Sequence, residues 1–198
     1  MNDQIVLVIG GPGSSGSSTI AKRLAKHFNI ERVYGGGYFR NEAESRGYDS
    51  LDSFYNQVQE SMIKEIDVKV DEHFRELAKK GGVLIESKIF AAIATKENIP
   101  CSAKIWITAS LEVRVMRALG KEKIFNPLKK FFRKKQITND LEKRWELDRK
   151  RYEDLYGLDY DNQGKYNDLV VDSSEQTEDE TFNLIVKFLK SKDIVCME

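Results

Sequence analysis

The stretch of sequence that decides the fold runs from residue 4 to residue 19 and reads QIVLVI-GGPGSSGSST. Gln4–Ile9 is a short apolar run that ends in glycine, which is typical of a buried parallel strand. The glycines that follow let the backbone curl so that successive N–H groups can point inward, and a helical pattern over Ser17–Phe28 begins directly after them. Because the N-terminus of a helix carries partial positive charge, we expect this loop to bind an anion, above all phosphate.

Two phosphate-binding templates fit these letters. The three spaced glycines match the G-x-G-x-x-G of dinucleotide-binding domains, and Glu31 lies at about the distance where such a domain has its ribose-binding acid. Gly11 and Gly16-Ser17-Ser18 also match the P-loop pattern G-x-x-x-x-G-K-[ST], except that serine replaces the lysine. Glu31 precedes a predicted strand instead of ending one, whereas Ser18 keeps the hydroxyl that would bind Mg²⁺. We therefore favour the P-loop.

The rest of the chain alternates strands with helices. Besides the first strand and helix, the patterns predict strands over 32–34, 83–85, 103–107 and 168–171 and helices over 39–46, 51–59, 63–80, 111–119, 137–155 and 178–189, with a basic helical stretch from Pro127. Such alternation requires right-handed crossovers, and hence a parallel sheet covered by helices on both faces. We predict one three-layer α/β domain over residues 1–198, with a five-stranded parallel sheet and a ligand site beyond the carboxyl ends of its strands.

Composition excludes several classes of protein. Apolar residues make up 40% of the chain and charged residues 32%, which is enough for a core and argues against disorder. Thirty-two Lys or Arg balance 32 Asp or Glu, so binding of nucleic acid or membrane through bulk charge is not expected. We expect neither a membrane span nor a cleaved signal peptide. Cys101 and Cys196 lack metal-ligand spacing and are expected to be reduced thiols of a cytoplasmic protein.

The balanced total hides a local imbalance of charge. Lys121–Arg151 contains twelve Lys or Arg against five Asp or Glu, whereas Gly157–Glu198 contains four against ten. The basic block is interleaved with aromatic residues, among them Phe131, Phe132 and Trp145. It is either a solvated helical hairpin or a lid that closes over phosphate, and we favour the lid.

Several further motifs occur in a fixed order along the chain. They are Thr19–Lys22 (TIAK), Gly35–Arg40 (GGGYFR), Val83–Lys88 (VLIESK), Arg144–Gly157 (RWELDRKRYEDLYG) and Asp168–Ser174 (DLVVDSS). Together with the glycine-rich loop they resemble the cytidylate kinases of the short form found in archaea and some small-genome bacteria. In that family the second and third motifs read A-G-D-I-F-R and V-V-L-E-G-R. The resemblance covers nearly the whole chain.

The resemblance implies a P-loop nucleoside monophosphate kinase that moves the γ-phosphoryl of ATP, with Mg²⁺, onto CMP or dCMP. It implies acceptor-binding helices over about 38–72 and a helical lid over about 120–151. The implied phosphate-binding residues are Gly11, Gly13, Ser14, Ser15, Gly16, Ser17, Ser18 and Thr19. The implied catalytic arginines are Arg117, Arg144, Arg149 and Arg151, the acceptor-binding residues are Arg40, Asp67, Asp71 and Lys88, and the metal-binding residues are Ser18 and Glu86. Small-molecule nucleotides are the expected partners of a monomer, without nucleic acid or membrane.

Elementary chemistry agrees with these implied roles. A guanidinium fork such as that of Arg40 matches phosphate bidentately, and Lys88 keeps the charge of the family's arginine without the fork. Asp67 and Asp71 lie one helical turn apart and could meet the acceptor's sugar or base, or could belong to a solvated helix face. Ser17 is the main departure, because a lysine there would bridge the donor phosphates.

Four alternatives to this function follow from the same residues. They are a kinase of another nucleotide or small molecule, a degenerate nucleotide-binding protein without catalysis, an NAD(P)-binding oxidoreductase, and a nucleic-acid binder with a basic lid, whose affinity would fall steeply with salt.

Overall fold

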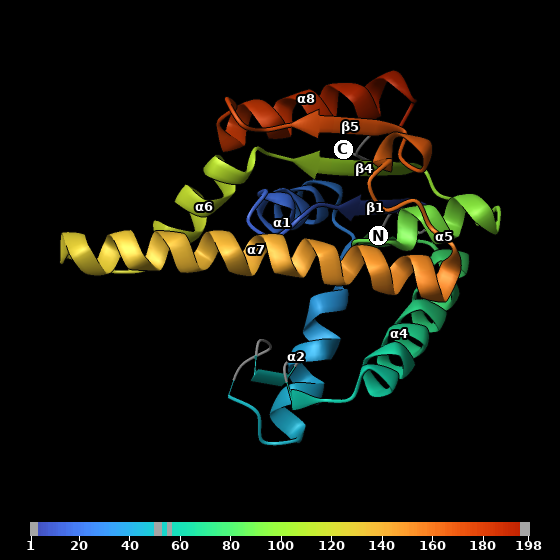
Figure 1. Cartoon of the computed structure of the whole chain (residues 1–198). Helices are drawn as coiled ribbons and strands as arrows, with labels where there is room; N and C mark the ends of the chain where they lie inside the picture. The colour runs from blue at the N-terminus through green and yellow to red at the C-terminus, as the bar shows by residue number, and fades with distance from the viewer. Residues whose placement is uncertain (1–3, 50–52, 55–56, 195–198) are drawn as a thin grey trace.

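The sheet of the computed structural model has five parallel strands in the order β2-β3-β1-β4-β5 (Figure 1). The structure describes residues 4–49, 53–54 and 57–194. The strands are β1 (Val6–Gly10), β2 (Glu31–Tyr34), β3 (Val83–Glu86), β4 (Ala103–Thr108) and β5 (Leu169–Asp172). The predicted three-layer α/β fold with a five-stranded parallel sheet is confirmed.

The register of the strands brings the chemistry-bearing residues to one edge of the sheet. In the parallel ladders Ile9 lies opposite Glu86, Tyr34 lies opposite Glu86 as well, and Gly10 lies opposite Trp106. The glycine-rich loop therefore leaves β1 beside the acidic residue that ends β3. This is the carboxyl edge of the sheet, where the sequence predicts the ligand site.

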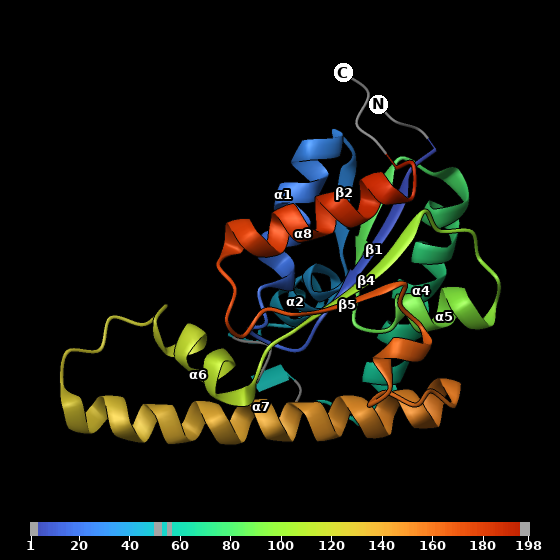
Figure 2. The same cartoon turned by 90° about the horizontal axis from the view of Figure 1, so that it is seen from above.

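Helices cover both faces of the sheet because the side chains of its strands alternate (Figure 2). Leu7 and Ile9 point into a core shared with α1 (Ser17–Phe28) and α8 (Glu178–Ser191). Val6 and Val8 point into a second core, which includes residues of α2 (Gly35–Ser45), α4 (Glu60–Lys80), α5 (Phe90–Lys96) and the C-terminal part of α7 (Pro127–Tyr156). The remaining elements are α6 (Leu111–Leu119) and a short 3-10 helix over Gln163–Lys165. No helix in the described part of the chain is long and apolar enough to cross a membrane.

The basic stretch forms one helix, α7, instead of the two pieces that its pattern indicates. Pro127 stands in the first turn, the Asn126 side chain accepts a hydrogen bond from the Lys129 amide at 3.1 Å, and Gly157 ends the helix at φ 59°. Because the sequence has no proline or glycine between Pro127 and Gly157, nothing interrupts the helix. The alternative of a solvated hairpin within this stretch is therefore wrong. The N-terminal end of α7 extends beyond α6 (Figure 2).

Other differences from the predicted elements are local. The short helix α5 was not predicted, because all of Phe90–Ala94 is buried and a helix that is apolar all round shows no amphipathic period. The Ser87 hydroxyl, two residues before the N-cap Ile89, accepts a hydrogen bond from the Phe90 amide at 3.2 Å. Helix α2 begins at Gly35, four residues before its predicted start. The predicted helix over 51–59 falls partly outside the described residues.

Candidate active site

The glycine-rich loop passes close to its surroundings, which explains its glycines. A Cβ atom on Gly11 would lie 2.5 Å from Ser15 Oγ and would also press on the Ile107 carbonyl. Gly16 has a φ of 99° and precedes the first turn of α1, so only glycine fits there without strain. The Ser17 amide donates to Ser15 Oγ at 3.4 Å and the Thr19 amide donates to the Gly16 carbonyl at 3.0 Å. The positive end of the helix dipole nevertheless lies at this loop, where it favours an anion.

A cavity of about 390 Å³ opens beside this loop, at the carboxyl edge of the sheet. It is lined by residues of the loop, α2, α4, β3 and its following segment, and α7. Twelve of the predicted site residues are brought together here: Gly11, Gly13, Ser14, Ser17, Ser18, Arg40, Asp67, Asp71, Glu86, Lys88, Arg144 and Arg151.

A second cavity of about 290 Å³ lies on the other side of the loop. Its walls include four further predicted residues, which are Ser15, Gly16, Thr19 and Arg117. The Arg117 guanidinium donates to the Ser15 carbonyl at 2.8 Å and to the Ser173 carbonyl at 2.7 Å. Arg117 therefore joins the loop to the segment that follows β5, and it forms one wall of this cavity.

The two cavities meet at two residues, Ser14 and Lys121, which line both of them. Lys121 is not among the predicted site residues. It lies in the turn that follows α6, outside any helix, so helical spacing gave no signal for it. A cation at the junction of two cavities can contact anionic groups in either of them.

Glu86 lies at the bottom of the larger cavity and is only 6% exposed. The Ser18 hydroxyl donates a hydrogen bond to its Oε1 atom, and Arg32 donates to its Oε2 atom, through Nε at 2.8 Å and through Nη2. A serine hydroxyl next to a carboxylate is an oxygen donor set that suits Mg²⁺, which usually binds one or two carboxylates together with substrate phosphates. The described residues contain no group of three or more His, Cys, Asp or Glu that could hold a metal by themselves. The predicted pair Ser18 and Glu86 thus fits a magnesium ion that is bound mainly through a nucleotide.

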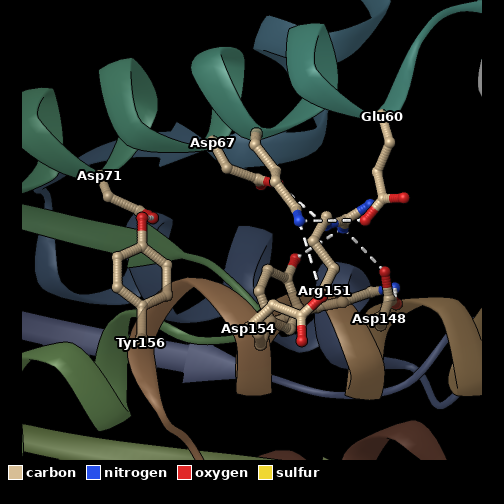
Figure 3. A network of polar contacts seen from close by, with 10 residues as sticks. Glu60, Asp67, Asp71, Asp148, Arg151, Asp154 and Tyr156 are labelled. Carbon is tan, nitrogen blue, oxygen red and sulfur yellow. Dashed lines mark hydrogen bonds and ion pairs between the residues drawn. The ribbon is translucent and has the colours of Figure 1, made fainter.

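A network of buried charges joins α7 to α4 (Figure 3). It also includes Lys88, two residues after the end of β3. Arg151 Nε lies 2.9 Å from Asp67 Oδ2, and Arg151 Nη2 lies 2.9 Å from Asp148 Oδ1. The Lys88 ammonium pairs with the other Asp148 oxygen. Close by, the Tyr156 hydroxyl donates to Asp71 Oδ2 at 2.6 Å. The alternative that Asp67 and Asp71 belong to a solvated helix face is therefore wrong, because they are 5% and 3% exposed.

Burial and neighbouring charges shift the ionisation of this network. Burial raises the pKa of Asp67 to about 7, although Arg151 works against it, and burial raises the pKa of Asp71 to about 6. Burial also acts to raise the pKa of Asp148, but Lys88 and Arg151 outweigh it and hold that pKa below its ordinary value. Burial lowers the pKa of Lys88 in spite of the attraction of Asp148. Asp148 therefore stays ionised, whereas Asp67 titrates near neutrality.

One predicted catalytic residue, Arg149, lies outside both cavities. Its side chain is 44% exposed and pairs with Glu146 at 2.7 Å. The reason is helical phase: Arg144, Asp148 and Arg151 share one face of α7, and Arg149 is turned about 100° from Asp148. In this structure Arg149 forms a surface ion pair, and its position does not support the predicted catalytic role.

Two arginines that the sequence pattern did not indicate form hydrogen bonds to residues of the site. Arg114 on α6 is 9% exposed and donates from Nε to the Gly13 carbonyl at 2.9 Å, so it holds the phosphate-binding loop. Arg32 on β2 holds Glu86, as described above. Only their tertiary contacts distinguish these arginines from ordinary surface residues, which is why pattern alone could not find them.

Comparison with known proteins gives relatives along nearly the whole chain. The family described as an AAA domain matches residues 9–127. The chain is 35% identical to a cytidylate kinase of Methanopyrus kandleri over 187 residues, which cover 91% of this chain and 91% of the relative. It is 34% identical to a cytidylate kinase of Methanocaldococcus jannaschii over 181 residues, which cover 91% and 95% of the two chains.

Solved structures agree on the fold. Shikimate kinase from Bacteroides thetaiotaomicron superposes with a TM-score of 0.59 at 11% identity, with 96% of this chain and 99% of that chain covered. Shikimate kinase from Aquifex aeolicus gives a TM-score of 0.55 at 15% identity over the same shares. These identities are too low to show more than a common kinase fold. The identity to the archaeal cytidylate kinases is higher and covers 91% of this chain, so the chain belongs to the cytidylate kinase family of nucleoside monophosphate kinases.

Proposed function

We propose that the chain transfers the γ-phosphoryl group of ATP to CMP or dCMP, which gives ADP and CDP or dCDP. The observation that carries this proposal is the meeting of two cavities at Ser14 and Lys121, at the phosphate-binding loop. A donor nucleotide in one cavity and an acceptor nucleotide in the other would place their phosphates at this junction. The printed names of the archaeal relatives support cytidylate as the acceptor.

The smaller cavity suits the base and sugar of the donor. It combines apolar walls, Ile20 and Ile107, with the polar side chains of Gln176 and Thr177 and the Arg117 guanidinium. An aromatic base can stack on a guanidinium plane and donate to neighbouring oxygens. The donor phosphates would then follow Ser14–Thr19 toward the junction, along the amides that begin α1.

The larger cavity suits the acceptor. Arg40 on α2 and Lys88 after β3 face it from one side, and Arg144 and Arg151 on α7 face it from the other. We assign residues 38–72 to acceptor binding. We assign residues 120–151 to a lid, which carries Lys121 and the cations of α7. Asp67 and Asp71 on α4 also line this cavity, and we assign them to recognition of the acceptor's sugar or base.

Ser18 and Glu86 are the residues that would hold Mg²⁺. When bound together with a nucleotide, the ion would neutralise negative charge on the donor phosphates. The Ser18 hydroxyl donates a hydrogen bond to Glu86, so the two oxygen donors lie next to each other.

Catalysis then depends on position and charge. The acceptor's attacking atom is an anionic phosphate oxygen, so no side chain has to act as a strong base. Negative charge spreads over the transferred group in the transition state, and preorganised cations stabilise it. With Ser17 in place of the usual lysine, that stabilisation falls to Lys121, Arg144 and Arg151, which line the larger cavity. Closure of α7 over the cavity would exclude water and so limit hydrolysis of the donor.

A screen of acceptors tests the proposal. ADP release from ATP and Mg²⁺ is measured with CMP, dCMP, UMP, AMP, GMP and dTMP in parallel. The expected result is the highest kcat/KM with CMP or dCMP. ATP binding without ADP release on any acceptor would identify a degenerate nucleotide-binding protein, and NAD(P) binding without ATP turnover would identify an oxidoreductase. Either result would overturn the proposal.

A further inference from the structure

The ion pair between Arg32 and Glu86 lies next to the proposed metal position. β2 and β3 pair in parallel with Tyr34 opposite Glu86 and Arg32 opposite Leu84. Because side chains alternate along a strand, Arg32, Tyr34 and Glu86 all lie on the face of the sheet that α1 covers. The guanidinium of Arg32 stacks on the Tyr34 ring, with 4.8 Å between its carbon and the ring centroid. Arg32 is thus held along its own strand and aimed at the end of the neighbouring one.

The two oxygens of Glu86 are divided between two partners. Oε2 accepts both hydrogen bonds from Arg32, and Oε1 accepts the hydrogen bond of the Ser18 hydroxyl. A guanidinium fork commonly takes both oxygens of a carboxylate, but here it takes one and leaves the other to the phosphate-binding loop. Because each oxygen has its own partner, the carboxylate is held between Arg32 on one side and Ser18 on the other.

We propose that Arg32 is a positioning residue that orients Glu86, and through it Ser18, for the metal–nucleotide complex. Arg32 lines neither cavity, so it acts through Glu86 and not on a nucleotide. Partners that orient metal-binding carboxylates typically change metal affinity about 10–100-fold when they are removed. A buried carboxylate that loses its cation would also turn toward another hydrogen-bond donor. The inference rests on the proposed function, because it concerns the same metal position.

Binding of Mn²⁺, as a probe for Mg²⁺, to the complex of the full chain with ADP tests the inference without turnover. Electron paramagnetic resonance measures the free Mn²⁺ as the complex is titrated. Arg32→Met is expected to weaken Mn²⁺ binding about 10–100-fold and to leave metal-free ADP binding unchanged. Arg32→Lys keeps the charge but has a compact ammonium in place of the planar fork. Its affinity for Mn²⁺ is expected to lie between those of wild type and Arg32→Met.

Arg75 offers a matched control. Its side chain is 17% exposed against 19% for Arg32, and it likewise donates two hydrogen bonds to one glutamate, Glu97, but at the surface of α4. Arg75→Met is expected to leave Mn²⁺ affinity as it is in wild type. If the Arg32–Glu86 ion pair were merely structural, Arg32→Met and Arg75→Met would both lower the free energy of unfolding, and neither would change the affinity for Mn²⁺.

A double-mutant cycle of Arg32→Met with Glu86→Gln provides a second test if Arg32→Met folds poorly. The double variant Arg32→Met/Glu86→Gln removes both charges and leaves no unpaired buried ion. It is expected to bind Mn²⁺ as Glu86→Gln alone does, because Arg32 would then have nothing to orient. The inference would be overturned if the Mn²⁺ affinities of the Arg32 variants lay within about twofold of that of Arg75→Met. It would also be overturned if Arg32→Met changed Mn²⁺ affinity equally in the presence and in the absence of the Glu86 carboxylate. Absence of Mn²⁺ binding by wild type with ADP would instead overturn the metal site of the proposed function, and this inference with it.

Discussion

The Lys88 ammonium on the segment after β3 pairs with the buried carboxylate of Asp148, which lies in the C-terminal third of α7. The second oxygen of Asp148 pairs with Arg151, so one carboxylate binds two of the cations proposed to meet phosphate. An entering phosphate group would compete with Asp148 for these cations. In this arrangement Asp148 holds the site together before substrate arrives.

Asp148→Asn is expected to lower the free energy of unfolding by about 3–5 kcal/mol, because it leaves buried cations without their counter-charge. Urea denaturation with and without CMP measures the effect. CMP should restore more stability to the variant than it adds to wild type, since its phosphate replaces the lost negative charge. Asp140→Asn, an exposed position on the same helix, serves as the control. Equal loss in both variants would contradict the role of Asp148.

The raised pKa of Asp67 predicts how stability depends on pH. Its pKa is about 7 in the folded state and 3.8 ordinarily, so between these values the folded chain binds a proton that the unfolded chain has released. The free energy of unfolding contributed by this group therefore falls as pH rises from about 4 to about 7, by at most about 4 kcal/mol.

Asp67→Asn should flatten that slope, which urea denaturation between about pH 4.5 and about pH 8 would measure. Asp71, with a pKa of about 6, adds a slope of the same sign that remains in the variant. An unchanged slope in Asp67→Asn would show that the group titrates at its ordinary pKa.

Arg40→Ala is expected to reduce kcat/KM for the acceptor by about 2–3 kcal/mol, through loss of a charged hydrogen bond to the acceptor's phosphate. Binding of ATP should change little, because Arg40 lines only the larger cavity. Arg46→Ala, just after the same helix, removes an exposed arginine that pairs with Glu42 and is the matched control. A comparable loss of ATP affinity in Arg40→Ala would place Arg40 on the donor side instead.

The N-terminal part of α7 and the segment before it should become more protected when both nucleotides bind. Lys121–Lys135 contains seven Lys or Arg and one Asp or Glu, so its like charges repel until phosphate neutralises them. Hydrogen exchange with and without a bisubstrate analogue measures this change. Equal protection in the two states would argue against a lid.

The sheet was predictable because its strands are short apolar runs with glycine and helical patterns between them, as Gln4–Ile9 shows. The boundaries of the helices were harder to predict. The start of α2 at Gly35 contradicts the low helix propensity of three successive glycines, and packing of Gly35 against Phe74 favours the helix there. The continuity of α7 follows from its caps and from the absence of breakers in its sequence.

The candidate site was predictable where residue type and loop position coincide, as in Ser14–Thr19 and Glu86. Helical spacing placed Arg144, Asp148 and Arg151 on one face, but it did not exclude Arg149, whose exposure only the packing of α7 decides. Lys121, Arg114 and Arg32 could not be inferred, because each obtains its role from a contact with a distant part of the chain.

The central claim is phosphoryl transfer to a pyrimidine monophosphate, stabilised by cations of the lid in place of a lysine at Ser17. The most direct measurement is the kcat/KM for CDP formation from ATP and CMP, with CDP itself quantified, in wild type and in Arg144→Ala, Arg151→Ala and Arg149→Ala. In wild type we predict that the amount of CDP formed equals the amount of ADP formed. Alanine at Arg144 or Arg151 should reduce kcat/KM by a factor equivalent to about 3 kcal/mol, and alanine at Arg149 should change kcat/KM little. Wild type that forms no CDP, or CDP formation that survives alanine at Arg144, Arg151 and Lys121 together, would contradict the account.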